Sequence, residues 1–176
     1  MKWSSKTKLT YLITVKSIPR GEKEIRFDNL RGGKVPDCVF IALLPQTNLS
    51  GDYADSSTHF QRNSVTEMNI TLNGNSVNGY PMSCSNGSPV NVLQKFIQTT
   101  GHHYNIKSPG TFDLAEFMQS WIWSHKFEAE MCDQGWLGVN FTLQKPFTEN
   151  MVMIMWVVSE QAITIDKFHQ IERLQH

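Results

Sequence analysis

The 176-residue sequence predicts an all-β fold, a single jelly-roll β-sandwich of about eight strands with one short helix in a connection. Three observations support this fold class. Several short segments alternate between apolar and polar residues, which is the pattern of half-buried strands. Glycine, proline and asparagine separate these segments, and only one segment has the spacing of an amphipathic helix. Many short strands between turns are typical of a sandwich or barrel.

Two long strands near the C-terminal end organise the predicted sandwich. In residues 136–147 the apolar side chains fall at every second position from Leu137 to Leu143, as a half-buried strand requires. Residues 151–158 are apolar throughout, so both faces must be covered, as in a central strand. A buried helix is the competing interpretation. The short run and the alternation that resumes at residues 163–165 favour a strand.

The first half of the chain supplies further strands. Residues 9–16 alternate between apolar and polar side chains, and Pro19 stops this strand. Residues 35–44 are nearly all apolar and are closed by Pro45, which predicts a buried strand. Around these two strands we expect a short strand at residues 24–27, a turn at residues 29–34 and a polar surface loop at residues 46–58.

A hairpin is predicted where the alternating residues 66–72 end at Asn73-Gly74. Both central residues of a type I′ turn need positive φ, which Asn and Gly adopt readily. A return strand beginning at Val77 and a loop at residues 78–87 are expected to follow.

The predicted helix covers residues 90–100. Ser88 can cap its free amides, Pro89 suits its first turn, and Gly101 suits a left-handed cap at its end. Beyond it we expect a loop at residues 102–110, a segment that is helical or extended at residues 111–117, a strand at residues 118–127, an acidic turn at residues 128–135 and a polar tail at residues 168–176.

The charges are distributed unevenly along a chain whose formal net charge is zero. Residues 1–34 hold nine Lys and Arg against three Asp and Glu, a net charge of +6, so the remainder carries −6. This basic segment could contact nucleic acid or an acidic neighbour, or its lysines could only keep strand edges from pairing. The candidate basic surface consists of Lys2, Lys6, Lys8, Lys16 and Arg20.

The sequence predicts an intracellular protein that is not an enzyme and needs no cofactor. Its three cysteines are too dispersed for a disulfide framework, and no signal peptide or membrane-spanning run is recognisable. It contains no nucleophile elbow, phosphate-binding loop or dinucleotide fingerprint. His102 and His103 could form a metal site with Asp113 or Glu116, and the acidic turn could bind calcium, but solvated side chains are the preferred interpretation in both places.

Four tryptophans are candidates for a subunit contact or a binding surface, because aromatic side chains contribute large contact areas at interfaces. They are Trp3, Trp121, Trp123 and Trp136. Trp121 and Trp123 share a strand face, so one of them is expected in the core, together with Trp156. Trp3 and Trp136 are the better candidates for exposure.

The order of these segments resembles the C-terminal jelly-roll domain of the major capsid protein of Polinton (Maverick) elements and adintoviruses. The similarity covers nearly the whole chain. It lies in residues 15–21, 35–44, 65–74, 90–101, 136–143 and 163–166. In that family each polypeptide carries two jelly rolls and three polypeptides form a pseudo-hexagonal capsomer, whereas residues 1–176 have room for one jelly roll.

The resemblance implies a structural protein that self-associates into a ring, capsomer or shell. The expected partners are further copies in a trimer, pentamer or hexamer-like ring, or another capsid-type jelly-roll chain, with the assembly in a virion or virus-like particle. Residues 1–8 and 168–176 would be flexible or assembly-linked tails. The alternative is a binding module that recognises carbohydrate or protein through residues 46–58 and 78–87. A metal enzyme of the cupin type would need inward histidines, and the six His are scattered.

Overall fold

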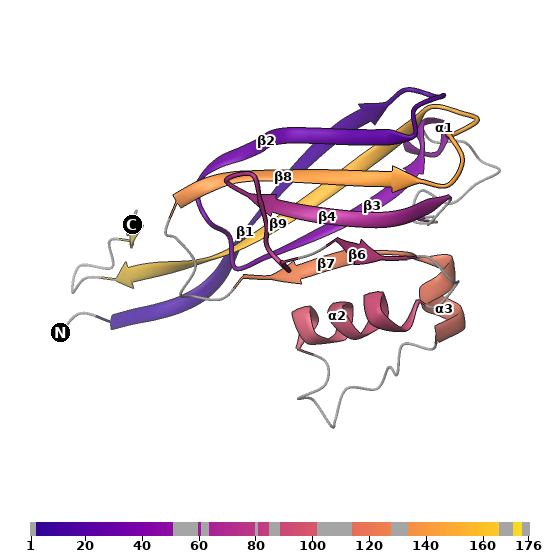
Figure 1. The fold of residues 1–176 in the computed structure, drawn as a ribbon. Coiled ribbons are helices and arrows are strands. Elements are labelled where there is room, and N and C mark those ends of the chain that lie inside the picture. The colour runs from indigo at the N-terminus through magenta and orange to yellow at the C-terminus, as the bar shows by residue number, and fades with distance from the viewer. Residues whose placement is uncertain are drawn as a thin grey trace.

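The two long C-terminal strands lie in different sheets of a β-sandwich (Figure 1). A computed structural model describes residues 3–50, 60, 64–79, 81–84, 89–101, 114–127, 134–165 and 171–173. Within this part of the chain each of the two sheets has five strands, and all the strand pairs are antiparallel. No helix in these ranges is both long and apolar enough to cross a membrane.

The first sheet has the order β1-β9-β3-β7, and β10 pairs with the far end of β9. Its strands are β1 (Trp3–Ile18), β3 (Cys38–Pro45), β7 (Trp123–Lys126), β9 (Met151–Ile165) and β10 (Ile171–Arg173).

The second sheet has the order β2-β8-β4-β5, and β6 also pairs with β4. Its strands are β2 (Glu24–Lys34), β4 (Val65–Leu72), β5 (Asn75–Ser76), β6 (Met82–Ser83) and β8 (Gln134–Leu143). Strands β1, β3, β7 and β9 thus alternate along the chain with β2, β4, β6 and β8 in the opposite sheet. This arrangement confirms the predicted jelly roll.

The core lies between the sheets, and β9 explains why its sequence is apolar at every position. Met151, Met153 and Met155 belong to the main core between the sheets. The alternate residues Val152 and Ile154 pack on the outer side in a smaller cluster with Leu44, Phe60 and Trp156. Both faces of β9 are therefore covered, as the sequence predicts.

The hairpin and the longest helix also agree with the sequence. Asn73 and Gly74 have φ values of 54° and 82°, as a type I′ turn requires, and Leu72 pairs with Asn75 across it. Helix α2 (Val90–Thr100) ends at Gly101, which has a φ of 73°. The return strand is β5, so it begins before Val77.

The structure corrects four predicted segments. Strand β2 continues through the expected turn at residues 29–34, because a bulge between Phe27 and Arg31 restores its pairing with β8. The expected loop at residues 46–58 begins with α1 (Gln46–Leu49), whose Asn48 is buried, and residues 51–58 lie outside the described chain. The loop at residues 78–87 contains β6. The strand expected at residues 118–127 is divided between α3 (Leu114–Gln119) and β7.

The expected tails lie partly within strands. Residues 3–8 continue β1 and pair with residues 160–165 of β9, and residues 171–173 form β10 on the other side of β9. In Figure 1 this ribbon extends beyond the sandwich. The other tail residues, 1–2, 168–170 and 174–176, lie outside the described ranges.

Candidate functional site

Trp121 and Trp123 lie in the core, fully buried. The sequence predicts one of the two in the core, and the structure confirms this. It also buries the other, because both rings belong to one aromatic cluster, so neither side chain is exposed to a partner. The rings follow one another from Phe96 to Phe117, Trp121, Trp123 and Phe141, with centroid distances of 5.7, 5.5, 5.9 and 5.6 Å. The cluster connects the helices to β8 in the opposite sheet.

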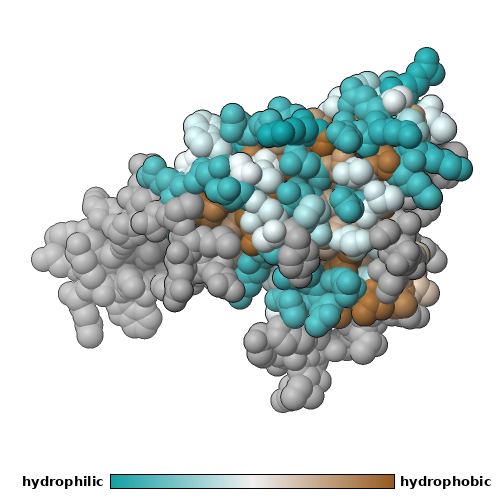
Figure 2. Space-filling model, viewed as in Figure 1, coloured by the Kyte–Doolittle hydropathy of each residue, from teal (hydrophilic) through white to brown (hydrophobic). Residues whose placement is uncertain are grey.

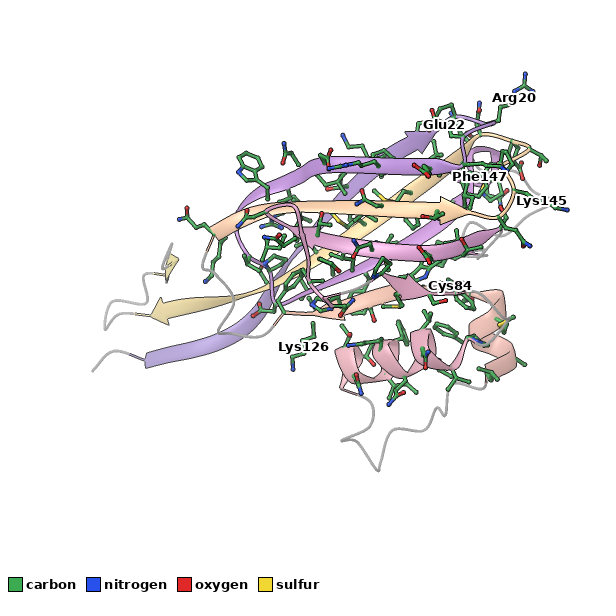
Figure 3. All side chains as sticks on the ribbon, viewed as in Figure 1. Arg20, Glu22, Cys84, Lys126, Lys145 and Phe147 are labelled. Carbon is green, nitrogen blue, oxygen red and sulfur yellow. The ribbon has the colours of Figure 1, made fainter. Side chains whose placement is uncertain are left out.

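Helix α2 covers the β7 end of the first sheet (Figure 1). Phe96 of α2 contacts Phe40 of β3 with ring centroids 6.1 Å apart, and the Ser124 hydroxyl donates to Oγ1 of Thr99 at 3.2 Å. On the inner side, Nε1 of Trp123 donates to Sγ of Cys84 at 3.3 Å. Figure 3 shows Cys84 beside β6 and β7. Strand β7 is therefore packed on both faces although it is the last strand of its sheet.

His125 is a buried titratable residue on β7, with 6% of its surface exposed. Its ring packs edge-to-face on Phe127 with centroids 4.8 Å apart, and among the described residues neither ring nitrogen has a hydrogen-bond partner. Burial, with a smaller contribution from the positive charge of Lys95, lowers the pKa of His125 from 6.5 to about 4. The sequence showed no signal for this site beyond the residue type, because the burial comes from distant segments.

Trp136 is exposed, as the sequence predicts, with 56% of its surface accessible. It lies opposite Gly32 of β2, and a Cβ built on Gly32 would come within 2.3 to 2.7 Å of three atoms of the indole ring. The indole therefore covers the Gly32 backbone. The backbone amide of Trp136 donates to Oδ1 of Asn73 at 2.9 Å, which ties β8 to the hairpin turn.

Two of the five candidate basic residues have side chains that the structure describes. Lys16 and Arg20 are exposed at the end of β1 and just after it. Figure 3 shows Arg20 near Glu22, Lys145 and Phe147, at one end of the sandwich. Lys6 and Lys8 lie further along β1 with side chains outside the described part, as for Trp3, and Lys2 is outside it altogether. Of the five residues, Lys6, Lys8 and Lys16 thus belong to the edge strand β1.

An exposed apolar patch lies on β1 and was not predicted from the sequence. Leu12, Ile13 and Val15 expose 46%, 57% and 47% of their surfaces. Ile13 pairs with Trp156 on the outer side of the sheet, whereas Leu12 pairs with Val157 on the core side. Strand β1 thus exposes apolar residues on both faces. The alternating pattern predicted the strand, but it did not show whether other segments pack on its two faces. Apolar residues on both faces were a signal of this exposure.

The remaining candidate regions contribute less. In the loop regions proposed for binding, the described residues include α1, with exposed Leu49, and β6, with buried Met82. His102, His103 and Asp113 lie outside the described chain, and the side chain of Glu116 is not described. Among the described residues, no group of three or more His, Cys, Asp and Glu is arranged to hold a metal ion.

Comparison with known proteins assigns no family. No protein-family model matches the sequence, and no curated protein matches it significantly.

Proposed function

We propose that this protein is a structural, capsid-protein-like jelly roll that self-associates into a ring, capsomer or shell. The observation that carries the proposal is the exposed apolar patch of Leu12, Ile13 and Val15 on an edge strand. An open strand edge with apolar side chains favours association, and such surfaces on soluble proteins often mark contact sites. The jelly-roll strand order and the resemblance to Polinton-type capsid proteins support the same function.

The mechanism is burial of the β1 edge and of aromatic surface between identical subunits. Trp136 is the aromatic residue best placed for such a contact, since its ring is held over Gly32 and is still half exposed. An aromatic side chain that is already fixed loses little conformational entropy when it binds. When two different surfaces of neighbouring subunits meet, the contact can repeat and close into a ring, which is the assembly expected here.

The first experiment is the solution mass of the protein across a concentration series, measured by light scattering on a sizing column, with the peak imaged by electron microscopy. Self-association into closed rings or larger particles is the expected result. A protein that stays monomeric at the highest concentration would overturn the proposed function.

A second candidate function is a binding module centred on Trp136. The specific observation is that Gly32 supports the indole while more than half of the residue is accessible. Flat ligands such as sugar rings stack on aromatic faces of this kind. A glycan array probed with the wild type and with Trp136→Ala tests it. Glycan binding that disappears in the variant, with assembly unchanged, would favour this function over the structural one.

A further inference from the structure

Strand β2 forms an open edge of the second sheet. It is the terminal strand there, and its only strand partner in the described chain is β8. The long terminal strand of the first sheet, β1, carries three lysines and no acidic residue, and edge lysines are a common device against self-pairing. The charges of β2 alternate in sign instead, from Glu24 to Arg26 and Asp28. Figure 2 shows hydrophilic surface along much of this strand. An edge with both signs of charge can match a second copy of itself.

The backbone groups that point away from β8 belong to Glu24 and Arg26. The backbone amide of Leu143 donates to the carbonyl of Lys23 at 2.9 Å, so Lys23 faces β8. In an antiparallel pair, residues whose amide and carbonyl face the partner strand alternate with residues whose groups face the other way. Ile25 therefore also faces β8, and Glu24 and Arg26 present their amides and carbonyls to the open side. These two exposed, charged residues are thus the ones that can form hydrogen bonds across the edge.

The charges of β2 select one register for pairing with a second, antiparallel copy. Residues with outward backbone groups must lie opposite one another, which leaves few registers. Where Glu24 lies opposite its own copy, or where Arg26 does, like charges meet and repel. The register between these two places Glu24 of each copy opposite Arg26 of the other, with Ile25 opposite its own copy on the two-fold axis. Both charged pairs are then attractive.

The paired segment is confined to the first part of β2. The bulge between Phe27 and Arg31 interrupts the strand and bends the residues that follow. The same register would bring Glu22 toward Asp28 of the other copy, but Glu22 precedes the strand and Asp28 lies in the bulge. The contact is therefore short, with hydrogen bonds at two symmetric pairs of residues.

Arg26 can bond within its own strand and to a second copy. Its Nε donates to Oδ1 of Asp28 at 2.9 Å, and 71% of the Arg26 side chain is exposed. A guanidinium carries five N–H donors, so the others can meet a second carboxylate. An exposed ion pair such as Arg26–Asp28 contributes little stability by itself. Sharing Arg26 with Glu24 of a second copy therefore costs the monomer little.

We propose that two copies of this chain associate through their β2 edges, in an antiparallel β2 contact centred on Ile25 and flanked by two Glu24–Arg26 pairs. The contact joins the second sheets of both copies into one continuous sheet. It is the same surface on both subunits, so by itself it ends at a dimer. This inference rests on the proposed self-association and adds a second surface to it, because rings built through one kind of contact need another to join them into a shell.

The experiment reverses each charge of the pair in the full chain. In Glu24→Arg both positions are basic, and in Arg26→Glu both are acidic, so each variant repels its own copy. The dissociation constant of the β2 contact should rise about 10- to 100-fold in either variant. The charge-swap variant, which carries both substitutions, brings opposite charges together again and should associate like the wild type. An equimolar mixture of the two single variants should do so as well, in mixed pairs. Sedimentation velocity over a concentration series measures each sample.

The control variant is Lys126→Glu, which reverses an exposed charge on β7, a terminal strand of the other sheet. It should associate like the wild type. Raising the salt concentration should reduce the difference between the wild type and the single variants, because exposed charges are screened. Circular dichroism of each variant checks that the sandwich is intact. Either single variant is sufficient for the comparison with the charge-swap variant, so the test survives if one of them does not fold.

The outcomes separate this inference from the proposed function. A wild type that associates while a folded single variant associates equally well overturns the β2 contact alone. Single variants that dissociate, with no recovery in the charge-swap variant or in the mixture, also overturn it, since the loss is then not due to the pairing of these charges. A wild type that forms only dimers, with monomeric single variants, supports the β2 contact and overturns the ring. A monomeric wild type overturns both the β2 contact and the proposed function.

Discussion

The two terminal strands of the first sheet, β7 and β1, differ in how the chain covers them. Strand β7 has four residues, and Trp123, Ser124 and His125 are buried beneath α2 and the aromatic cluster. Strand β1 has sixteen residues and exposes Leu12, Ile13 and Val15. The shorter strand is better buried, because helices inserted before it cover its end of the sheet. Burial of an edge strand depends on the covering segments rather than on its own length or apolar content.

The comparison predicts that substitutions at the β7 end affect folding, whereas those at the β1 end affect association. The largest effect is expected for Trp123→Ala. Removing a fully buried indole leaves a cavity and should lower the free energy of unfolding by about 3 to 5 kcal/mol. Urea denaturation followed by circular dichroism measures it. Trp136→Ala, in which an exposed indole is removed, is the matched control and should cost less than about 1 kcal/mol. Equal losses in the two variants would contradict the assigned core.

The second-largest effect on stability is expected from a change of pH, and it also involves the β7 end. The pKa of His125 is about 4 in the folded protein and 6.5 for an unperturbed histidine, so between these values the unfolded chain binds more protons. The free energy of unfolding is therefore highest above pH 6.5, where His125 is neutral in both states. It decreases as the pH falls toward 4, by up to about 3 kcal/mol. Denaturation of the wild type and of His125→Phe at several pH values tests this. If the free energy of unfolding falls equally in the wild type and in His125→Phe between pH 6.5 and 4, the lowered pKa of His125 is refuted.

A smaller effect is expected at Gly32, on the face of the second sheet. The Cβ added by Gly32→Ala would meet the ring of Trp136, which has to turn away, and the variant should lose about 1 kcal/mol. In a Trp136→Ala background the obstruction is absent, so the same substitution should cost much less. Thermal unfolding of the four proteins in this double-mutant cycle gives the coupling. Additive effects would show that the ring does not lie on Gly32.

The smallest effect on folding is expected at the β1 end. Ile13→Thr replaces a half-exposed apolar residue by a β-branched polar one, and should change the free energy of unfolding by less than about 0.5 kcal/mol. Denaturation must be measured at a protein concentration where the wild type is monomeric. A loss comparable to that of Trp123→Ala would show that the β1 end is covered within the monomer, which would remove the contrast between the two ends.

The elements that the sequence predicts well are those set by local signals. Asn73-Gly74 determines a turn by its backbone preference, and the uninterrupted apolar run of β9 requires cover on both faces. By contrast, Gly32 and Gly33 resemble turn residues, yet they pair with Trp136 and Gly135. The indole above Gly32 compensates for its missing side chain, and that contact joins segments about a hundred residues apart.

The candidate site was less predictable, because exposure depends on where distant segments end. Trp121 and Trp123 have strand spacing, but the chain changes from helix to strand between Gln119 and Trp123 to fit them into the aromatic cluster. Leu12 and Ile13 are exposed because, among the described elements, β1 packs mainly against β9. The burial of both tryptophans has no local signature, and the exposure on β1 had one local signal, the apolar residues on both faces of the strand.

The pairing of both chain ends with β9 has a consequence for rearranging the connectivity. Trp3 and Ile171 both lie opposite Ile165, on either side of the same strand, so they are two strand spacings apart, about 10 Å. A linker of a few residues could join β10 to β1, and new termini could be opened at the Asn73-Gly74 turn. Such a circular permutant would retain every strand pair in the two sheets except the β4–β5 hairpin.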